Sequence, residues 1–293
     1  MPRRTAIIGL ALAGAIGLSG CGPVQFDVAF FGDVPYSSSA ITKYDSMISD
    51  INRSGVAFSS HVGDIGPGIS ATCTNETVDR ETRRFDTLAQ PLVYTPGDNE
   101  WTDCGTGAVQ LSRLSYLRQQ VFRNTGTESR GQTRMALESQ ASRGYPENTR
   151  WRRGPVTFAT LHIVGSNDNV SAAEHGPRRQ ATIDWLRETF AQARDRGDKG
   201  VVLIAQRDPN LTTTVSSAYR SMNEAVRDEV SGFFGQVLFV SGDAHSYTQV
   251  NSVAGLSNFR WVRVEGDSLV SYVRTRIDTS TSSLFSISQP KRF

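Results

Sequence analysis

The chain has 293 residues, of which 38% are hydrophobic and 20% charged, and its 31 Lys and Arg nearly balance 29 Asp and Glu, for a formal net charge of +2. This composition is ordinary for a globular protein with a substantial core, folded as one large domain or two small ones. A charge so close to balance gives no reason to expect nucleic acid as a partner.

The first twenty residues differ from the rest of the chain. Two arginines precede an apolar stretch from Ala6 to Leu18, which is too short to span a bilayer as a stable helix, and this pattern predicts a secretory signal over residues 1 to 20. It ends in Leu-Ser-Gly-Cys, which resembles the lipobox of bacterial lipoproteins. The resemblance implies cleavage before Cys21, its lipidation and an anchor on the extracytoplasmic side of a bacterial cell envelope, with residues 21 to 25 as a short tether. Cleavage and secretion without a lipid is the alternative.

The rest of the chain alternates between strand and helix patterns. We expect strands at Phe26 to Phe31, Val56 to Val62, Pro91 to Tyr94, Val156 to Val164, Val201 to Ala205, Gln236 to Val240, Trp261 to Val264 and Leu269 to Arg274. We expect helices at Ala40 to Ser54, Val78 to Leu88, 109 to 121, Gln180 to Ala193 and Tyr219 to Val230. Residues 122 to 154 are polar and predict an excursion from the core, and residues 276 to 293 predict a polar tail. The alternation predicts one α/β domain over residues 26 to 275, built on a mixed sheet or on two packed sheets.

Four of the predicted strands are followed by Gly-Asp. They are DVAFFGD, which ends at Asp33, FSSHVGD at Asp64, LVYTPGD at Asp98 and QVLFVSGD at Asp243. Ligands of α/β folds bind beyond the carboxyl ends of the strands, so we expect the four acids to face one cleft. Gly next to each Asp lets the backbone turn sharply and approach a ligand closely.

Four carboxylates in one cleft need a positive partner. Two unit charges ~4 Å apart repel by ~4 kcal/mol at an effective dielectric of 20, and no Lys or Arg lies inside these four segments. A bound divalent cation or protonation of some acids would relieve the repulsion. His245, two residues after Asp243, adds one imidazole. A set of oxygen ligands with one nitrogen favours one or two ions of Mg²⁺, Mn²⁺ or Ca²⁺ over Zn²⁺.

Five segments in this order resemble the sequence blocks of the calcineurin-like metallophosphoesterase superfamily. They are FFGDVPY, HVGDIG, PGDNE, LIAQRDPN and SGDAHSY. The resemblance implies a two-sheet sandwich flanked by helices, in four αββα layers, and hydrolysis of a phosphate mono- or diester by a metal-activated water. It implies that Asp33 and His245 bind a first cation and that Asp64 bridges to a second. Asp98 and Asp243 stand at two further ligand positions.

Three positions depart from the family pattern. Pro35 stands where the family has a metal-binding His and has no ligand atom to offer. Asn99 stands where the family has a His that protonates the leaving group, which leaves Asn99 to orient phosphate. Gln206 replaces a third His as a weak oxygen ligand, and Arg207 beside it is a candidate phosphate clamp.

These departures leave two hypotheses. The first is a metal-dependent phosphoesterase that acts on a phosphorylated small molecule. The second is a non-catalytic envelope protein that keeps the fold and a structural cation.

Cys73 and Cys104 remain once Cys21 is assigned to the anchor. In an exported protein this pair predicts a disulfide rather than two free thiols, and it would tie the loop after Asp64 to the loop after Asp98.

The remaining histidines and one tryptophan have structural interpretations. His61 and His162 lie inside strands and are expected in the core, and Trp101 is expected to pack its loop. His175 is expected in an exposed loop.

Overall fold

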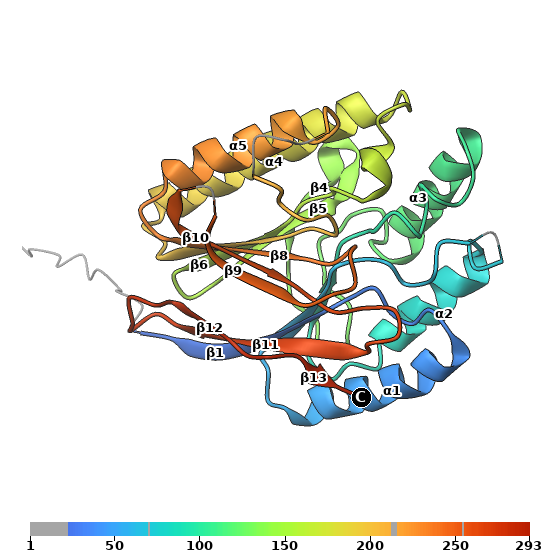
Figure 1. The fold of residues 1–293 in the computed structure, drawn as a ribbon, viewed down its shortest axis with the longest axis horizontal. Coiled ribbons are helices and arrows are strands. Elements are labelled where there is room, and N and C mark those ends of the chain that lie inside the picture. Colours follow the sequence, from blue (N-terminus) through green and yellow to red (C-terminus); the bar gives the residue numbers. More distant parts are fainter. Residues whose placement is uncertain (1–22, 70, 212–215, 254) are drawn as a thin grey trace, which may run out of the picture.

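Two β-sheets lie face to face with helices on both outer sides (Figure 1) in the computed structural model, which describes residues 23–69, 71–211, 216–253 and 255–293. The predicted signal over residues 1 to 20 and the predicted lipid site Cys21 lie outside the described residues. Within the described part of the chain, no helix is both long enough and apolar enough to cross a bilayer.

The first sheet has the strand order β12-β11-β1-β2-β3, and β13 also pairs with β11. Its strands are β1 (Gln25–Phe31), β2 (Phe58–His61), β3 (Leu92–Tyr94), β11 (Ser271–Asp278), β12 (Phe285–Ile287) and β13 (Lys291–Arg292). β1, β2 and β3 are parallel, and β11 runs antiparallel to β1. The carboxyl ends of the three parallel strands therefore meet at one edge.

The second sheet has the order β4-β5-β6-β7-β8-β10-β9. Its strands are β4 (Glu138–Gln140), β5 (Tyr145–Arg153), β6 (Val156–Thr160), β7 (Gly200–Ile204), β8 (Gln236–Ser241), β9 (Thr248–Val253) and β10 (Leu256–Arg263). β6, β7, β8 and β10 are parallel, and the outer strands are antiparallel to their neighbours.

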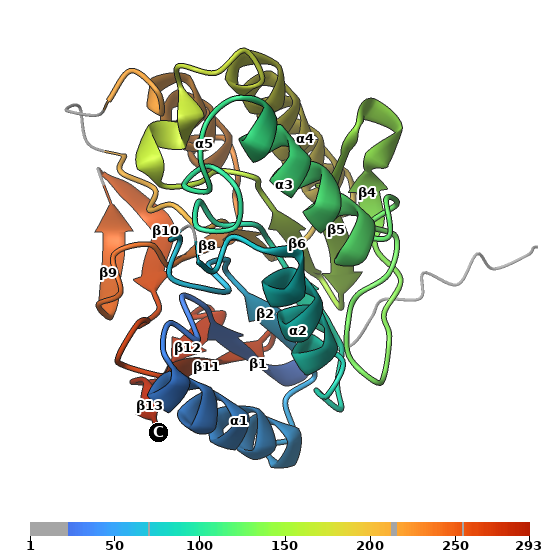
Figure 2. The same cartoon turned by 90° about the vertical axis from the view of Figure 1, so that its right-hand side faces the viewer.

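Among the residues that the structure describes, five α-helices cover the sheets. They are α1 (Ser38–Arg53), α2 (Asn75–Phe85), α3 (Ala108–Gln120), α4 (His175–Asp195) and α5 (Arg220–Ser231), with short 3₁₀ turns at Ala141–Arg143 and Ser166–Asn169. Figure 2 shows α1 and α2 on one side of the sandwich and α4 and α5 on the other. The four-layer αββα sandwich that the resemblance implies is confirmed.

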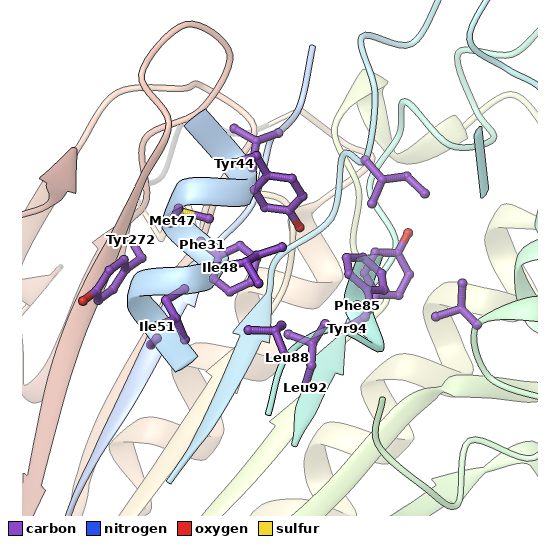
Figure 3. Close-up of a cluster of buried hydrophobic side chains, with 14 of the residues drawn as sticks. Phe31, Tyr44, Met47, Ile48, Ile51, Phe85, Leu88, Leu92, Tyr94 and Tyr272 are labelled. Atoms are coloured by element: carbon purple, nitrogen blue, oxygen red, sulfur yellow. The ribbon is translucent and has the colours of Figure 1, made fainter. Parts of the chain in front are cut away.

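The helix α1 shows how the outer layers form. The hydroxyl of Ser37 accepts a hydrogen bond from the N–H of Ala40 and caps the first turn. Tyr44, Met47, Ile48 and Ile51 then recur every three or four residues, so they share one buried face. In Figure 3 this face packs against the first sheet beside residues of α2 and β3.

The layer between the sheets is apolar. Phe30 and Phe58 from the first sheet meet Phe158, Val202 and Val240 from the second, and all five are fully buried. Alternation explains this core, because side chains on the other face of each strand point toward the helices.

Two segments that the sequence assigned outside the core belong to the sheets. Residues 122 to 154 contain β4 and β5, and residues 276 to 293 contain β12 and β13. The sequence pattern does not reveal strand β5 because most of its buried residues are polar: Glu147, Asn148, Thr149 and Arg150 are buried in a row, beside the apolar Trp151. Their partners are polar residues of distant segments, so the strand shows no hydrophobic alternation.

Candidate metal centre

The four Gly-Asp ends converge at one edge of the sandwich. Asp33, Asp64, Asp98 and Asp243, which we call the acid site, come from the loops after β1, β2, β3 and β8. Hydrogen bonds and shared neighbours join them, because the backbone N–H of Asp243 donates to Asp33 Oδ1 at 2.8 Å, and Gln206 contacts the other three. Asp33, Asp64 and Asp98 are buried. The structure therefore brings the four acids together at one edge of the sandwich.

The backbone at these positions is unusual. Asp33, Asp64 and Asp243 have φ of 53°, 62° and 69°, and His245 has φ of 54°. Residues other than Gly rarely adopt this left-handed backbone conformation, and Asp is among the few that tolerate it. The strands therefore end in strained turns that aim the carboxylates inward, a feature that clusters at functional sites.

Glycines make room for the carboxylates. A Cβ at Gly97 would lie 1.9 Å from Asp64 Oδ1, and one at Gly242 would lie 2.1 Å from Asp33 Oδ2. A Cβ at Gly165 would lie 2.3 Å from Asp243 Oδ1. Any larger residue would push the acids apart, so the glycines are a steric requirement of the site.

One part of the acid site has the geometry of a cation site. Ligand atoms of Asp33, Asp64 and His245 all lie within 4.8 Å of one another. Asp33 Oδ2 is buried and has no hydrogen-bond partner among the described residues. A buried carboxylate oxygen without a partner is costly, and a cation bound by Asp33 would offset that cost.

The other part of the acid site is filled by Gln206. Its Nε2 lies 2.9 Å from Asp98 Oδ1, 3.2 Å from Asp243 Oδ1 and 3.2 Å from Asp64 Oδ2. The expectation that Gln206 offers an oxygen ligand is wrong in this geometry, because its amide nitrogen faces the acids. Arg207 forms an ion pair with Asp243 Oδ2 at 3.0 Å, so a positive charge does reach the site.

Tyr36 is the site residue that the sequence did not reveal. Its hydroxyl donates to Asp64 Oδ2 at 3.0 Å, lies 3.3 Å from His245 Nε2 and accepts from Asn99 Nδ2 at 2.8 Å. The second hydrogen of Asn99 Nδ2 goes to the carbonyl of Gly66. Asn99 therefore holds Tyr36 in place. The one sequence signal for Tyr36 is that it directly follows Pro35, the position at which the family has a metal ligand.

The acid site lacks enough positive charge for its carboxylates. Burial and neighbouring acids raise the pKa of Asp33 and of Asp64 well above their usual range. Burial also raises the pKa of Asp98 to about 6 and that of Glu100 to about 7. Ionising the whole site therefore requires a further positive charge.

Glu100 supports the loop rather than the acid site itself. Its carboxylate accepts hydrogen bonds from the Tyr94 hydroxyl and from the backbone N–H groups of Ile65 and Gly97. The predicted Cys73–Cys104 disulfide is present and spans 31 residues. It ties the loop after Asp64 to the loop after Asp98, as expected.

A second buried polar cluster lies beside the acid site. We call it the balanced cluster, and its members are Arg118, Glu147, His162, Asp168, His175 and Arg178. Arg118 contacts both oxygens of Glu147, which also lies 2.8 Å from His162 Nδ1. Arg178 donates to Asp168 at 2.8 Å, and His175 Nε2 lies 3.1 Å from the same carboxylate.

The acids of the balanced cluster are neutralised by their partners. Burial opposes ionisation of Glu147, but His162 and Arg118 together lower its pKa to about 2. Burial lowers the pKa of His162, so the ring is neutral at pH 7 and Arg118 is the permanent opposing charge. Arg178 and His175 likewise outweigh burial and lower the pKa of Asp168.

The three remaining histidines were predicted with mixed success. His61 is buried among Phe31, Phe85 and Tyr94, and His162 is buried against Trp101, so both core assignments and the packing role of Trp101 are confirmed. The exposed position expected for His175 is wrong. It begins α4 and is buried because it contacts Asp168, 7 residues earlier in the chain.

A small groove opens beside Tyr36. It has a volume of about 190 Å³ and its walls include Pro35, Ser37, Pro67, Thr72 and Arg80. A larger hollow of about 500 Å³ lies between the start of β8 and the turn after β11, away from the acids, and is therefore less relevant to their chemistry.

No family model and no curated protein matches this chain. Among solved structures, the chain is similar to a dimetal phosphatase from Danio rerio, with a TM-score of 0.56 and 11% identity over 87% of this chain and 95% of that one. It is also similar to the protein TT1561 of Thermus thermophilus, with a TM-score of 0.52 and 12% identity over 91% of this chain and 99% of that one. At this level of identity the likeness shows a calcineurin-like metallophosphoesterase fold.

Proposed function

We propose that this protein is a metal-dependent hydrolase of phosphate esters, with a divalent cation held by Asp33, Asp64 and His245. The observation that carries the proposal is the approach of their ligand atoms to within 4.8 Å of one another. In addition, the buried Asp33 Oδ2 has no hydrogen-bond partner in the described part of the chain. The similar fold of a dimetal phosphatase supports it.

The donor atoms fit a hard cation. Two carboxylates and one imidazole, with water completing the shell, suit Mg²⁺, Mn²⁺ or Ca²⁺ better than a tetrahedral Zn²⁺ site. The glycines around Asp33 and Asp64 leave space where a Cβ would clash. A cation would also supply the charge that the raised pKa values of these acids call for.

A bound cation lowers the pKa of a water molecule and stabilises negative charge that develops on phosphate oxygens. Tyr36 donates its hydrogen to Asp64 and orients that carboxylate, while Asn99 fixes the Tyr36 hydroxyl. The guanidinium of Arg207, which is partly exposed, is the positive group available to contact a phosphate oxygen.

Neither Asn99 nor Tyr36, which lie beside the proposed cation site, is a ready acid for the leaving group. Both hydrogens of Asn99 Nδ2 are already used. Burial and the neighbouring acids raise the pKa of Tyr36 far above its usual range, so its phenol keeps its proton. We therefore expect the preferred substrates to be small phosphorylated molecules with good leaving groups, since these need no proton donor.

Hydrolysis of an activated aryl phosphate and of an aryl phosphodiester tests this function. Turnover should appear with Mg²⁺, Mn²⁺ or Ca²⁺ and disappear in Asp64→Asn. Asp184→Asn, on the exposed side of α4 where it contacts Gln180, is the matched control and should keep full activity. Cation-independent turnover, or activity retained in Asp64→Asn, would contradict the proposal.

A non-catalytic envelope protein with the same fold is the second candidate. It is favoured by Pro35, Asn99 and Gln206, which stand where the family has imidazoles. Cation binding that raises the melting temperature, without turnover of any activated ester, would support this candidate over the enzyme.

We further propose export and lipid anchoring at Cys21 in a bacterial envelope. The Leu-Ser-Gly-Cys sequence supports it, and β1 begins only at Gln25, so the tether is short. The acid site lies about 20 Å away at the other end of β1, because a strand rises about 3.3 Å per residue. Expressed in a bacterium, the chain should enter the detergent phase on partitioning and Cys21→Ser should not. Equal partitioning of both would contradict the anchor.

A further inference from the structure

Gln206 occupies the centre of one half of the acid site. It follows β7 by two residues and its side chain is fully buried. Its Nε2 lies within 3.2 Å of oxygens from Asp64, Asp98 and Asp243. An amide nitrogen has two hydrogens, so three carboxylates share them.

The orientation of this amide is fixed from the other side. The backbone N–H of Gly165 donates to Gln206 Oε1 at 2.6 Å. If the amide flipped, Nε2 would face that N–H, donor against donor, and a buried N–H would lose its acceptor. The backbone of Gln206 is also held, because its carbonyl accepts from the N–H of Gly242 at 2.9 Å.

Each of the three carboxylates therefore has one oxygen in contact with Gln206 Nε2. Asp243 uses Oδ1 for Gln206 and Oδ2 for Arg207. Mg²⁺ and Ca²⁺ lie about 2.0 to 2.6 Å from their oxygen ligands. A cation shared by Asp64, Asp98 and Asp243 would have to lie where Gln206 Nε2 lies now. The amide and the cation exclude each other.

The half formed by Asp33, Asp64 and His245 differs because the group among its ligand atoms is a hydroxyl. The Tyr36 oxygen lies 3.0 Å from Asp64 Oδ2 and 3.3 Å from His245 Nε2 and, unlike an amide nitrogen, it has a lone pair that can face a cation. Asp33 Oδ2 lacks a partner among the residues described, and Asp64 Oδ1 receives only the backbone N–H of Asn99 at 3.2 Å, within the same part of the chain. The ligand atoms are in place and no amide stands between them.

We propose that the side-chain amide of Gln206 takes the place of a second cation, so that this chain binds one divalent cation at Asp33, Asp64 and His245 instead of a pair. The proposal rests on the cation site of the proposed function and adds its stoichiometry. Gln206 then acts as a positioning residue for Asp64, Asp98 and Asp243.

Mn²⁺ titration of the full, metal-stripped chain tests this inference, by calorimetry for the stoichiometry and by electron paramagnetic resonance for spin coupling. The wild type should bind one Mn²⁺ per chain with the spectrum of an isolated ion. Gln206→Glu keeps the shape of the side chain but replaces the donor with an acceptor. It should bind two, with the spectrum of a coupled pair.

Gln192→Glu on α4 is the matched control and should stay at one ion, and denaturant unfolding of each variant without metal checks that it is folded. If Gln206→Glu does not fold, Gln206→His replaces it, because an imidazole supplies a ligand without adding a charge.

Each outcome decides the question. Two ions in the wild type would overturn this inference and leave the proposed function standing, whereas no bound ion would overturn both. One ion in a folded Gln206→Glu or Gln206→His variant would show that the amide is not what excludes the second cation, and the inference would fail.

Discussion

The acid site and the balanced cluster both bury several carboxylates, and the loop that follows β6 touches both. Its Gly165 lies against Asp98 and Asp243, and its Asp168 belongs to the balanced cluster. In the balanced cluster each acid contacts an arginine, and the pKa values of Glu147 and Asp168 are lowered. In the acid site Arg207 is the one nearby arginine among the described residues, and the pKa values of Asp33, Asp64 and Asp98 are raised. The acids of the balanced cluster are neutralised by other side chains of the protein, whereas those of the acid site need a further positive charge, as expected of a ligand-binding site.

The largest effect should come from breaking the balanced cluster. Arg178→Met would leave Asp168 and Glu174 without their buried partner, and we expect a loss of about 3 to 5 kcal/mol in the free energy of unfolding. Urea unfolding measures it. Arg143→Met, which breaks an exposed pair with Glu188, should cost about 1 kcal/mol or less. Similar losses in both variants would remove the distinction between the clusters.

A cation should stabilise the acid site alone. At a Mn²⁺ concentration 100 times the dissociation constant, we expect a gain of about 2.7 kcal/mol in unfolding free energy at pH 8. Asp33→Asn should lose this gain because it removes a ligand, while Asp184→Asn should keep it. A gain that survives in Asp33→Asn would place the cation elsewhere.

The two regions should respond to pH in separate windows. The pKa values of Asp98 and Glu100, about 6 and about 7 in the folded chain, exceed their unfolded values, so their contribution is fully present below about pH 4 and is lost as pH rises through 6 to 7. We expect a loss of about 4 kcal/mol between pH 5 and 8 without metal, because the folded pKa of Asp98 lies about one unit above pH 5 and that of Glu100 about two units above it, at about 1.4 kcal/mol per unit.

The lowered pKa values of Glu147 and Asp168 act in the opposite sense. Their contribution is present above about pH 4.5 and is lost as pH falls toward 2. Unfolding free energy measured by urea from pH 3 to 8 should therefore have its maximum near pH 5, and Mn²⁺ should flatten the alkaline side. A monotonic rise up to pH 8 in the metal-free chain would contradict the charge imbalance of the acid site.

The smallest expected effect comes from replacing one Asp by Asn in each region and comparing the change in the free energy of unfolding. Asp98→Asn keeps an oxygen for Gln206 and removes a charge that burial disfavours, so we expect a gain of about 1 kcal/mol at pH 8 without metal. Asp168→Asn should instead be destabilising, because Arg178 loses its counter-ion. Urea unfolding of the pair tests this, and two changes of the same sign would count against it.

The sequence was informative where residues act locally. A strand followed by Gly-Asp predicted the positions of Asp33, Asp64, Asp98 and Asp243, because the chain direction of a strand fixes the edge at which its acid emerges. The helix α1 could also be predicted, because its apolar residues recur in the sequence at helical spacing. His61 was assigned to the core because it lies inside a strand.

Residues whose role depends on distant partners could not be predicted. Strand β5 buries Glu147 against Arg118 and His162, and nothing in its own letters indicates these partners. The orientation of the Gln206 amide could not be predicted, because it is set by the backbone N–H of Gly165, which lies 41 residues away. The misplacement of His175 has a local cause, because α4 begins at His175 and not at Gln180 as the apolar spacing predicts.

The disulfide between Cys73 and Cys104 makes the candidate site depend on where the chain matures. Its two sulfurs lie 3.8 and 3.3 Å from the carbonyl oxygen of Asn99, so the bond braces the same loop that positions Tyr36 and Asp64. A chain produced in a reducing cytosol would carry all its acids but not this brace. Preparations with different oxidation histories should therefore be compared only after their free thiols have been counted.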